Sequence, residues 1–114
     1  MTEKTKKDDI GKPDFTLIPQ EALLEVAKVF SHGATKYGKF NYSLGTDYSR
    51  YVAACHRHLN TWLMGENLDE IGTNHIGNAI ASLMMLLDNI KTNIGIDDRN
   101  KVYQRSKSIQ IELF

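Results

Sequence analysis

Apolar side chains recur at the spacing of an α-helix in three stretches, and this periodicity limits the possible fold more than any other feature of the chain. The stripes run through residues 22–30, 51–63 and 76–90. They predict one helix over 19–31, a second that ends at Met64 and a third that ends near Asn93. We therefore expect an all-α fold, a small bundle of three to four main helices around one core, completed by oligomerisation.

Capping and turn residues predict where these helices begin and end. Thr46 or Asp47 is the expected N-cap of the second helix, and Thr73 or Asn74 is that of the third, because their side-chain oxygens can accept from free backbone N–H groups. Gly33 is expected to end or bend the first helix. A short helical turn and a loop should then lead to the second helix.

The composition indicates one globular domain with a limited core. The 114 residues are 41% hydrophobic, and 14 basic side chains balance 14 acidic ones. Domains that bind nucleic acid are usually basic, so we expect no nucleic-acid partner. Cys55 is the single cysteine and cannot form an internal disulfide, which fits a reducing compartment. No apolar run approaches the ~20 residues of a membrane span and the N-terminus lacks a secretory signal, so we expect a soluble cytoplasmic protein.

Three segments differ in composition. Residues 1–12 are polar and charged and predict a flexible tail, unless Lys12 closes over an anionic ligand. Residues 13–95 carry the helical stripes and form the predicted domain. Residues 96–114 should be a charged tail with a candidate short strand at 108–114, where apolar and polar residues alternate. That strand could pair with another subunit or be mobile.

The densest group of polar residues joins the end of the second helix to the start of the third. It contains His56, Arg57, His58, Glu66, Asp69, Glu70 and His75. Glu66 and Asp69 offer the carboxylate oxygens that Mg²⁺ prefers, and Glu25 of the first helix is a candidate third ligand. These residue types therefore favour a divalent cation at this junction.

Other interpretations of the same group stay open. Acidic side chains in a loop between helices are more often solvated than functional, and His75 could be an ordinary residue at a helix start. His56 and His58 are two apart on a helix and point in different directions, so at most one belongs to a site, and we favour His58. The spacing of the cysteine and the histidines matches no zinc site.

A second group follows the first predicted helix. Lys36 lies between Gly33 and Gly38, and lysine beside glycines can bind phosphate through a point charge and a close backbone. Tyr37 or Tyr42 could stack on a nucleobase. The alternative is a helix end whose tyrosine covers the core. Two arginines of the second helix, Arg50 and Arg57, could add positive charge or lie at the surface without a ligand.

Large apolar residues on the helical stripes are expected to fill the core rather than to bind a ligand. Trp62 lies on the stripe of the second helix, and Met84 and Met85 lie on the third. The apolar face of the third helix is wide enough to be packed on more than one side.

The motifs, taken in order, resemble a known family. The series is Gly11-Lys-Pro-Asp14, Leu17-Ile-Pro-x-Glu21, Gly33-Ala-x-Lys36-Tyr37-Gly38-x-x-Asn41, Arg57-His58-x-x-x-Trp62-x-x-Gly65-Glu66-x-x-Asp69, and His75. It resembles the phage and bacterial dATP/dGTP diphosphohydrolases, which include MazZ and related MazG-like all-α nucleotide pyrophosphohydrolases. The resemblance implies that residues 13–95 bind a nucleotide. It also implies a homo-oligomer that uses Mg²⁺ or Mn²⁺ to cut a (d)NTP, preferably a purine deoxynucleotide, to the monophosphate and pyrophosphate.

The resemblance also suggests a role for each candidate residue. His75 and Glu66 would be catalytic, and a carboxylate or His75 would orient the attacking water. The metal would be held by Glu66, Asp69 and Glu25. The residues expected to contact the substrate are Lys36, Tyr37, Asn41, Arg57 and His58.

The chain departs from the family pattern at several positions. Asn78 stands where the family has a second histidine, and Ser82 stands where it has an asparagine. Asparagine can form hydrogen bonds but cannot shuttle a proton at neutral pH. The MazG signature has two glutamates three residues apart, whereas Glu21 and Glu25 are four residues apart. The acidic loop of this chain is also one residue shorter than in the family pattern.

Two alternatives to the enzyme follow. The first is a catalytically inactive protein on the same scaffold that binds or sequesters a nucleotide, including a signalling nucleotide of host defence if the source is a phage. The second is a helical oligomerisation or adaptor module that uses the segment from Ile109 to Phe114 as its contact. We favour the enzyme, because the ordered motif series points to it.

Overall fold

The computed structural model describes residues 3–99, and within them the fold is all-α, as predicted. Three α-helices, α1 (Gln20–Tyr37), α2 (Tyr48–Leu63) and α3 (His75–Lys91), are accompanied by two short 3-10 turns, η1 (Phe15–Leu17) and η2 (Asn41–Leu44). Residues 3–99 contain no β-strand, and the candidate strand at 108–114 lies outside the described residues. None of the described helices is both long and apolar enough to cross a bilayer.

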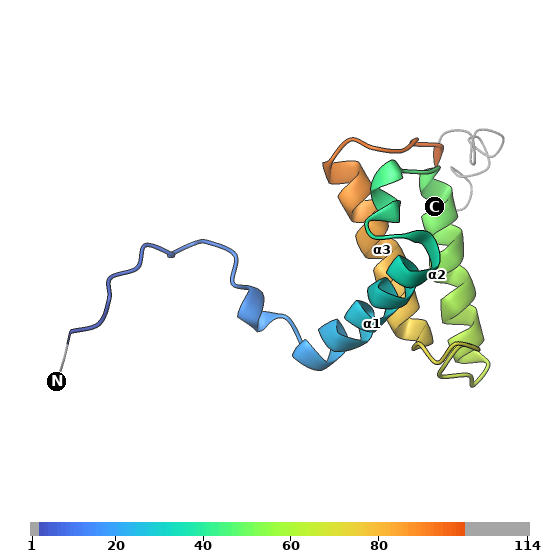
Figure 1. The fold of residues 1–114 in the computed structure, drawn as a ribbon, viewed down its shortest axis with the longest axis horizontal. Helices are drawn as coiled ribbons and strands as arrows, with labels where there is room; N and C mark the ends of the chain where they lie inside the picture. Colours follow the sequence, from blue (N-terminus) through green and yellow to red (C-terminus); the bar gives the residue numbers. More distant parts are fainter. Residues whose placement is uncertain (1–2, 100–114) are drawn as a thin grey trace, which may run out of the picture.

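The helices form a pair with a third helix across it (Figure 1). The loop 64–74 joins α2 to α3, which run antiparallel in close contact, and α1 packs against α3. Residues 92–98 cross back from the end of α3 to the start of α2, and residues 3–18 form an arm that leads away from the three helices. The chain therefore places the loop 64–74 and the end of α1 near the same part of the α2–α3 pair.

Most helix ends follow their local sequence signals. Asn74 is the N-cap of α3, as predicted, and its side chain accepts a hydrogen bond from Gly77 N at 3.0 Å. Asp47 occupies the N-cap position of α2 without a side-chain hydrogen bond. The prediction that the first helix ends near residue 31 is wrong, because α1 continues through Gly33 to Tyr37. It ends at Gly38, whose φ of 94° favours glycine.

The core is made of small and medium side chains. Its buried hydrophobic residues are Val26, Cys55, Ala79 and Ala81. Trp62 and Met84, which we expected in the core, are 43% and 44% exposed. Their helices meet through small residues elsewhere on each helix, so the larger apolar side chains are left on the outer faces.

The crossing segment is attached to the start of α2. Tyr48 N donates to Ile96 O at 2.9 Å, and Ile96 N donates to Thr46 O at 3.1 Å. Ser49 donates to the Asp98 carboxylate through both its backbone N–H and its hydroxyl. Gly95 has a φ of 85°, and a Cβ there would lie 2.6 Å from Thr46 O. The close approach of the two segments therefore requires glycine at position 95.

Gly95→Ala is expected to destabilise the fold by roughly 2–5 kcal/mol, from the left-handed backbone and from overpacking. Gly72→Ala is the matched control, because Gly72 has a φ of 88° and no atom within 4 Å of the added Cβ. Urea denaturation should therefore give a larger loss of unfolding free energy for Gly95→Ala. Equal losses in the two variants would show that crowding of the added Cβ at position 95 contributes nothing to the loss of unfolding free energy.

Candidate functional site

Two adjoining pockets lie where α1 and η2 face α2. The larger pocket has a volume of about 890 Å³ and the smaller one about 410 Å³. Val29, Gly33 and Tyr37 line both pockets. Residues at the end of α1 therefore separate two hollows that one ligand could span.

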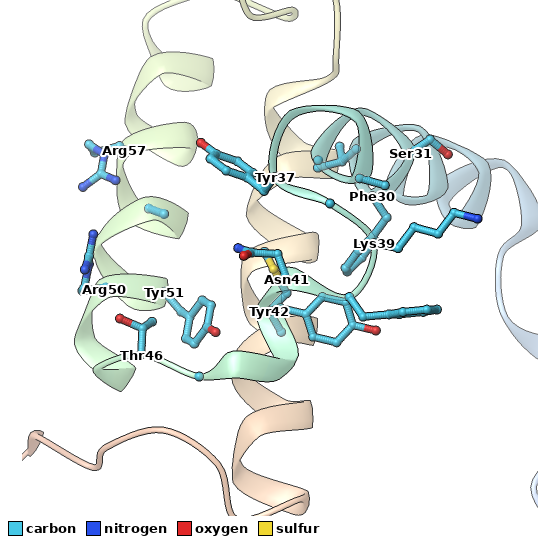
Figure 2. Close-up of a pocket in the computed structure, with 18 residues that line it drawn as sticks. Phe30, Ser31, Tyr37, Lys39, Asn41, Tyr42, Thr46, Arg50, Tyr51 and Arg57 are labelled. Atoms are coloured by element: carbon cyan, nitrogen blue, oxygen red, sulfur yellow. The ribbon is translucent and has the colours of Figure 1, made fainter.

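Aromatic, amide and cationic groups line the larger pocket. Tyr37 comes from α1, Asn41 and Tyr42 from η2, and Arg50 and Tyr51 from α2. Figure 2 shows Tyr37 directed toward α2, and it shows the asparagine between Tyr37 and the two other tyrosines. Such a lining suits a ligand that has a flat ring and hydrogen-bonding edges.

Positive charge gathers on the α2 side of this pocket. Arg50 and Arg57 both line it, and their spacing places them two turns apart on the same helix (Figure 2). Lys39 also lines the pocket, on the side of Asn41 away from the arginines. The pocket can therefore attract an anionic ligand, and the arginines offer forked donors that match phosphate oxygens.

The smaller pocket combines a lysine with imidazole and carboxylate groups. Its lining includes Lys36, His58, Asp69 and Asn78. The Lys36 ammonium lies 5.1 Å from the centroid of the Tyr37 ring, within the range of a cation–π contact. This contact keeps a positive charge at the boundary between the two pockets.

Two histidines from different helices meet at this pocket. The Nδ1 atoms of His58 on α2 and His75 on α3 lie 2.9 Å apart. Burial lowers the pKa of His58 below its ordinary value, and the charges of His75 and Arg57 lower it further while Asp69 opposes them. His58 is therefore neutral at pH 7 and can accept a proton.

His75 lies behind His58 and lines neither pocket. It is only 5% exposed, and its Nε2 is buried without a hydrogen-bond partner. The nearest carboxylate oxygen to this nitrogen is Glu66 Oε2, at 3.9 Å. The three side chains therefore form a row from the exposed Glu66 through the buried His75 to His58 at the pocket.

Asp69 stabilises the loop 64–74 through hydrogen bonds. One carboxylate oxygen accepts from the backbone N–H groups of Ile71 at 3.1 Å and Thr73 at 2.9 Å, and the other accepts from the Thr73 hydroxyl at 2.7 Å. Burial alone would raise the pKa of Asp69, but these hydrogen bonds outweigh it and the net pKa is lowered. Asn78 donates to Thr73 Oγ1 at 2.9 Å and so stabilises the same loop.

The expected cation ligands do not converge. Among residues 3–99, no three histidine, cysteine, aspartate or glutamate side chains are placed to hold one metal ion. Glu25 pairs with Lys28 at 3.1 Å on the surface of α1, Glu66 is exposed, and Asp69 is engaged in the loop. The described residues thus do not fit a closed cation site built from these three carboxylates alone.

Each of the five substrate-contact residues predicted from the sequence lines one of the two pockets. Tyr37, Asn41 and Arg57 line the larger pocket, and Lys36 and His58 line the smaller one. Glu25 and Glu66 line neither pocket. His56, two residues before His58, is exposed and lies in neither lining.

Some lining residues were not among the predicted substrate contacts. Tyr51 was assigned to the apolar stripe of the second helix, although it lines the larger pocket. Glu70 and His32 line the smaller pocket, although neither was among the predicted site residues. A tyrosine within an apolar stripe is a usable signal, because its hydroxyl needs a partner when the ring is buried.

Comparison with known proteins identifies the family. The sequence model described as "dATP/dGTP diphosphohydrolase, N-terminal" matches residues 2–99, which include all of the described structure. The chain belongs to this family.

A relative with the same family name supports this assignment. The "dATP/dGTP diphosphohydrolase" of Salmonella phage PMBT28 is 33% identical over 94 residues. The match covers 82% of this chain but 32% of that protein, so the chain spans about a third of the relative's length. No solved structure matches the chain. Membership of the diphosphohydrolase family confirms the resemblance drawn from the motif series.

The pKa of His58 is expected to fall below ~6.5 in an NMR titration of its imidazole, because burial and His75 disfavour the charged ring. His56→Gln, at an exposed position two residues away, should leave this pKa unaltered. A His58 pKa at or above the ordinary value would contradict this description of the site.

Proposed function

We propose that the chain hydrolyses a purine deoxynucleoside triphosphate to the monophosphate and pyrophosphate. The observation that carries the proposal is the pair of adjoining pockets, one basic and aromatic and the other holding a neutral histidine beside a lysine. The name of the phage relative supplies the substrate class, dATP and dGTP, which are both purine deoxynucleotides. Cleavage between the α- and β-phosphates gives the two products.

The larger pocket is proposed to hold the nucleoside. Its volume of about 890 Å³ lies in the range of sites for small organic ligands, which is about 300–1,000 Å³. Tyr37 and Tyr51 offer aromatic surfaces to a base, and the Asn41 amide can both donate to and accept from its edge. This set of groups supports recognition of a base and sugar rather than of phosphate alone.

The phosphates are proposed to lie at the boundary of the two pockets. Arg57 borders the larger pocket, and Lys36 borders the smaller one. A triphosphate carries several negative charges, and cations on both sides of it would offset the cost of bringing them together. His58 then lies on the smaller-pocket side, where water can reach the α-phosphorus.

The geometry of the histidine pair favours one arrangement of protons. If His58 donates through Nδ1–H to His75 Nδ1, then Nε2 of His58 is free to accept a proton. His75 then carries its proton on Nε2, the nitrogen 3.9 Å from the Glu66 carboxylate. The opposite arrangement would turn an unprotonated nitrogen of His75 toward a negative oxygen. We therefore assign His58 as the general base, with His75 and Glu66 as the groups that orient it.

In the proposed step, a water oxygen forms a bond to the α-phosphorus as the bond from that phosphorus to the bridging oxygen of pyrophosphate breaks. The water proton passes to Nε2 of His58, and the electron pair of the broken bond leaves with pyrophosphate. This assignment differs from the sequence-based one, in which His75 was the catalytic histidine, because His75 is buried and lines neither pocket.

Dependence on Mg²⁺ or Mn²⁺ remains part of the proposal. Mg²⁺ commonly binds through one or two carboxylates together with substrate phosphates and water, so it does not require a site built wholly from protein. Glu66 is the exposed carboxylate beside the histidine pair and is the first candidate for such a contact. An assay with and without a chelator tests this directly.

His58→Gln is expected to lower kcat by about 10²–10⁴-fold, because it removes the general base. The measurement is incubation of the purified protein with each dNTP and Mg²⁺ or Mn²⁺, with chromatography of the monophosphate and pyrophosphate. In the unaltered protein the rate should rise with pH as His58 loses its proton, with the midpoint below ~6.5 since the pKa is lowered.

His56→Gln is the matched control for this experiment, because it makes the same change two residues away at an exposed position. It should leave kcat unaltered. Equal rates for His58→Gln and the unaltered protein would contradict the assignment of the base. Binding of a nucleotide without any turnover would contradict the hydrolase itself and favour an inactive binding protein.

We also propose that the chain works as a homo-oligomer in the cytoplasm. Five apolar side chains on α3 are between 36% and 59% exposed in the single chain. They are Ile80, Leu83, Met84, Leu87 and Ile90. Their spacing forms a stripe along one face, and an uncharged apolar stripe can pair with itself across a two-fold axis. The free buried thiol of Cys55 is compatible with a reducing cytoplasm.

Leu87→Glu is expected to weaken this assembly, because it places a charge in the apolar stripe. Leu87 is 59% exposed in one chain, so the variant should still fold. Sedimentation velocity should show a smaller species than the unaltered protein gives at the same concentration. Asn60→Glu, on an exposed position of α2, is the control. A monomeric unaltered protein would overturn the proposed assembly.

A further inference from the structure

One polar side chain lies fully buried in the apolar helix α3. Asn89 is 0% exposed, and both the oxygen and the nitrogen of its side-chain amide form hydrogen bonds. Its Oδ1 accepts from the Tyr51 hydroxyl at 2.9 Å, and its Nδ2 donates to Tyr42 O at 3.0 Å. Because a buried amide costs free energy unless its hydrogen bonds are made, these two contacts are what make asparagine tolerable at this position.

Both partners of Asn89 line the larger pocket, and they come from different elements. Tyr51 belongs to α2, and Tyr42 belongs to η2. The two partners lie 38 and 47 residues from Asn89 in the sequence. A single amide on α3 therefore holds two walls of the pocket at a fixed separation, while Asn89 itself does not line the pocket.

The surroundings fix the amide in this position. A Cβ at Gly95 would lie 3.3 Å from Asn89 Oδ1, so the crossing segment closes directly over the side chain. The backbone carbonyl of Asn89 also accepts from Ile94 N at 2.9 Å. Burial raises the pKa of Tyr51, and the charge of Asp88 raises it further, so the tyrosine hydroxyl remains a donor at neutral pH.

We propose that Asn89 is a positioning residue for the larger pocket, which sets the place of the Tyr51 ring and of η2 and thereby the affinity for the nucleoside. The identity of the ligand rests on the proposed function, whereas the positioning of η2 does not. Asn89 touches no substrate in this arrangement, and it acts through Tyr51 and Tyr42.

Tyr51→Phe and Tyr48→Phe form a matched pair for the test. Each removes one partly buried hydroxyl that makes one hydrogen bond of 2.9 Å, to Asn89 Oδ1 and to Ile94 O respectively. Tyr48 lines neither pocket. Tyr51→Phe should raise the KM for dATP or dGTP about fivefold or more, the effect of one lost hydrogen bond, with kcat changed less. Tyr48→Phe should leave KM unaltered.

Asn89→Ala extends the test to both contacts and should raise KM more than Tyr51→Phe does. A KM that is unchanged in Tyr51→Phe, or raised equally by Tyr48→Phe, would overturn the proposal and leave Asn89 as a general stabilising residue. If Asn89→Ala does not fold, the tyrosine pair still decides between these outcomes.

A second readout needs no ligand and no turnover. Hydrogen exchange of the backbone amides at 41–45 should be faster in Tyr51→Phe and Asn89→Ala than in the unaltered protein, and it should be unchanged in Tyr48→Phe. If no dNTP is hydrolysed but this exchange pattern is found, the proposed function fails and the positioning role stands. Unchanged exchange at 41–45 in both variants would overturn the positioning role whatever the activity.

Discussion

The close approach of the three helices at small side chains of α3 is the constraint on which the rest of the structure depends. Gly77, Ala79 and Ala81 are buried on this helix, and a Cβ at Gly77 would lie 3.4 Å from the carbonyl oxygen of Glu25 on α1. Small residues let helix backbones come near one another but bury little apolar area per residue. The larger apolar side chains therefore remain on outer faces, which is the observation behind the proposed homo-oligomer.

Close packing at one end of α3 also accounts for the position of the site. The first residue of α3, His75, is carried into contact with His58 of α2, because the loop 64–74 reverses the chain tightly. Asp69 holds that reversal through hydrogen bonds to Thr73 and Ile71, so its carboxylate contributes to the site mainly by fixing the loop. Near the other end of α3, Asn89 is the proposed positioning residue for the larger pocket, because it bonds to Tyr51 and to η2.

Local patterns in the sequence were sufficient to predict the fold class, the presence of the three helices and one of the N-caps, because each of these depends on residues close together in the chain. The Asn74 cap is such a case. The extent of α1 was not predictable from Gly33, since glycine lowers helix stability by only about 1 kcal/mol and the packing of α1 on α3 outweighs it. Trp62 was misplaced because periodicity identifies an apolar face without saying whether the same chain covers it.

Several of the residues that line the pockets were predictable from the sequence, but the position of each relative to the others was not. The sequence indicates that His58, His75 and Asn78 lie close together. Only the contacts in the structure show that His58 lines a pocket and that His75 lies behind it. Asn78, where the resemblance implies a histidine, donates its amide to Thr73 and to the backbone of Asn74. Ser82, at the other departure, bonds to the carbonyl of residue 78 within α3 and is buried. Both side chains support the loop and the helix, which leaves the histidine pair as the proposed proton-transferring group of the smaller pocket.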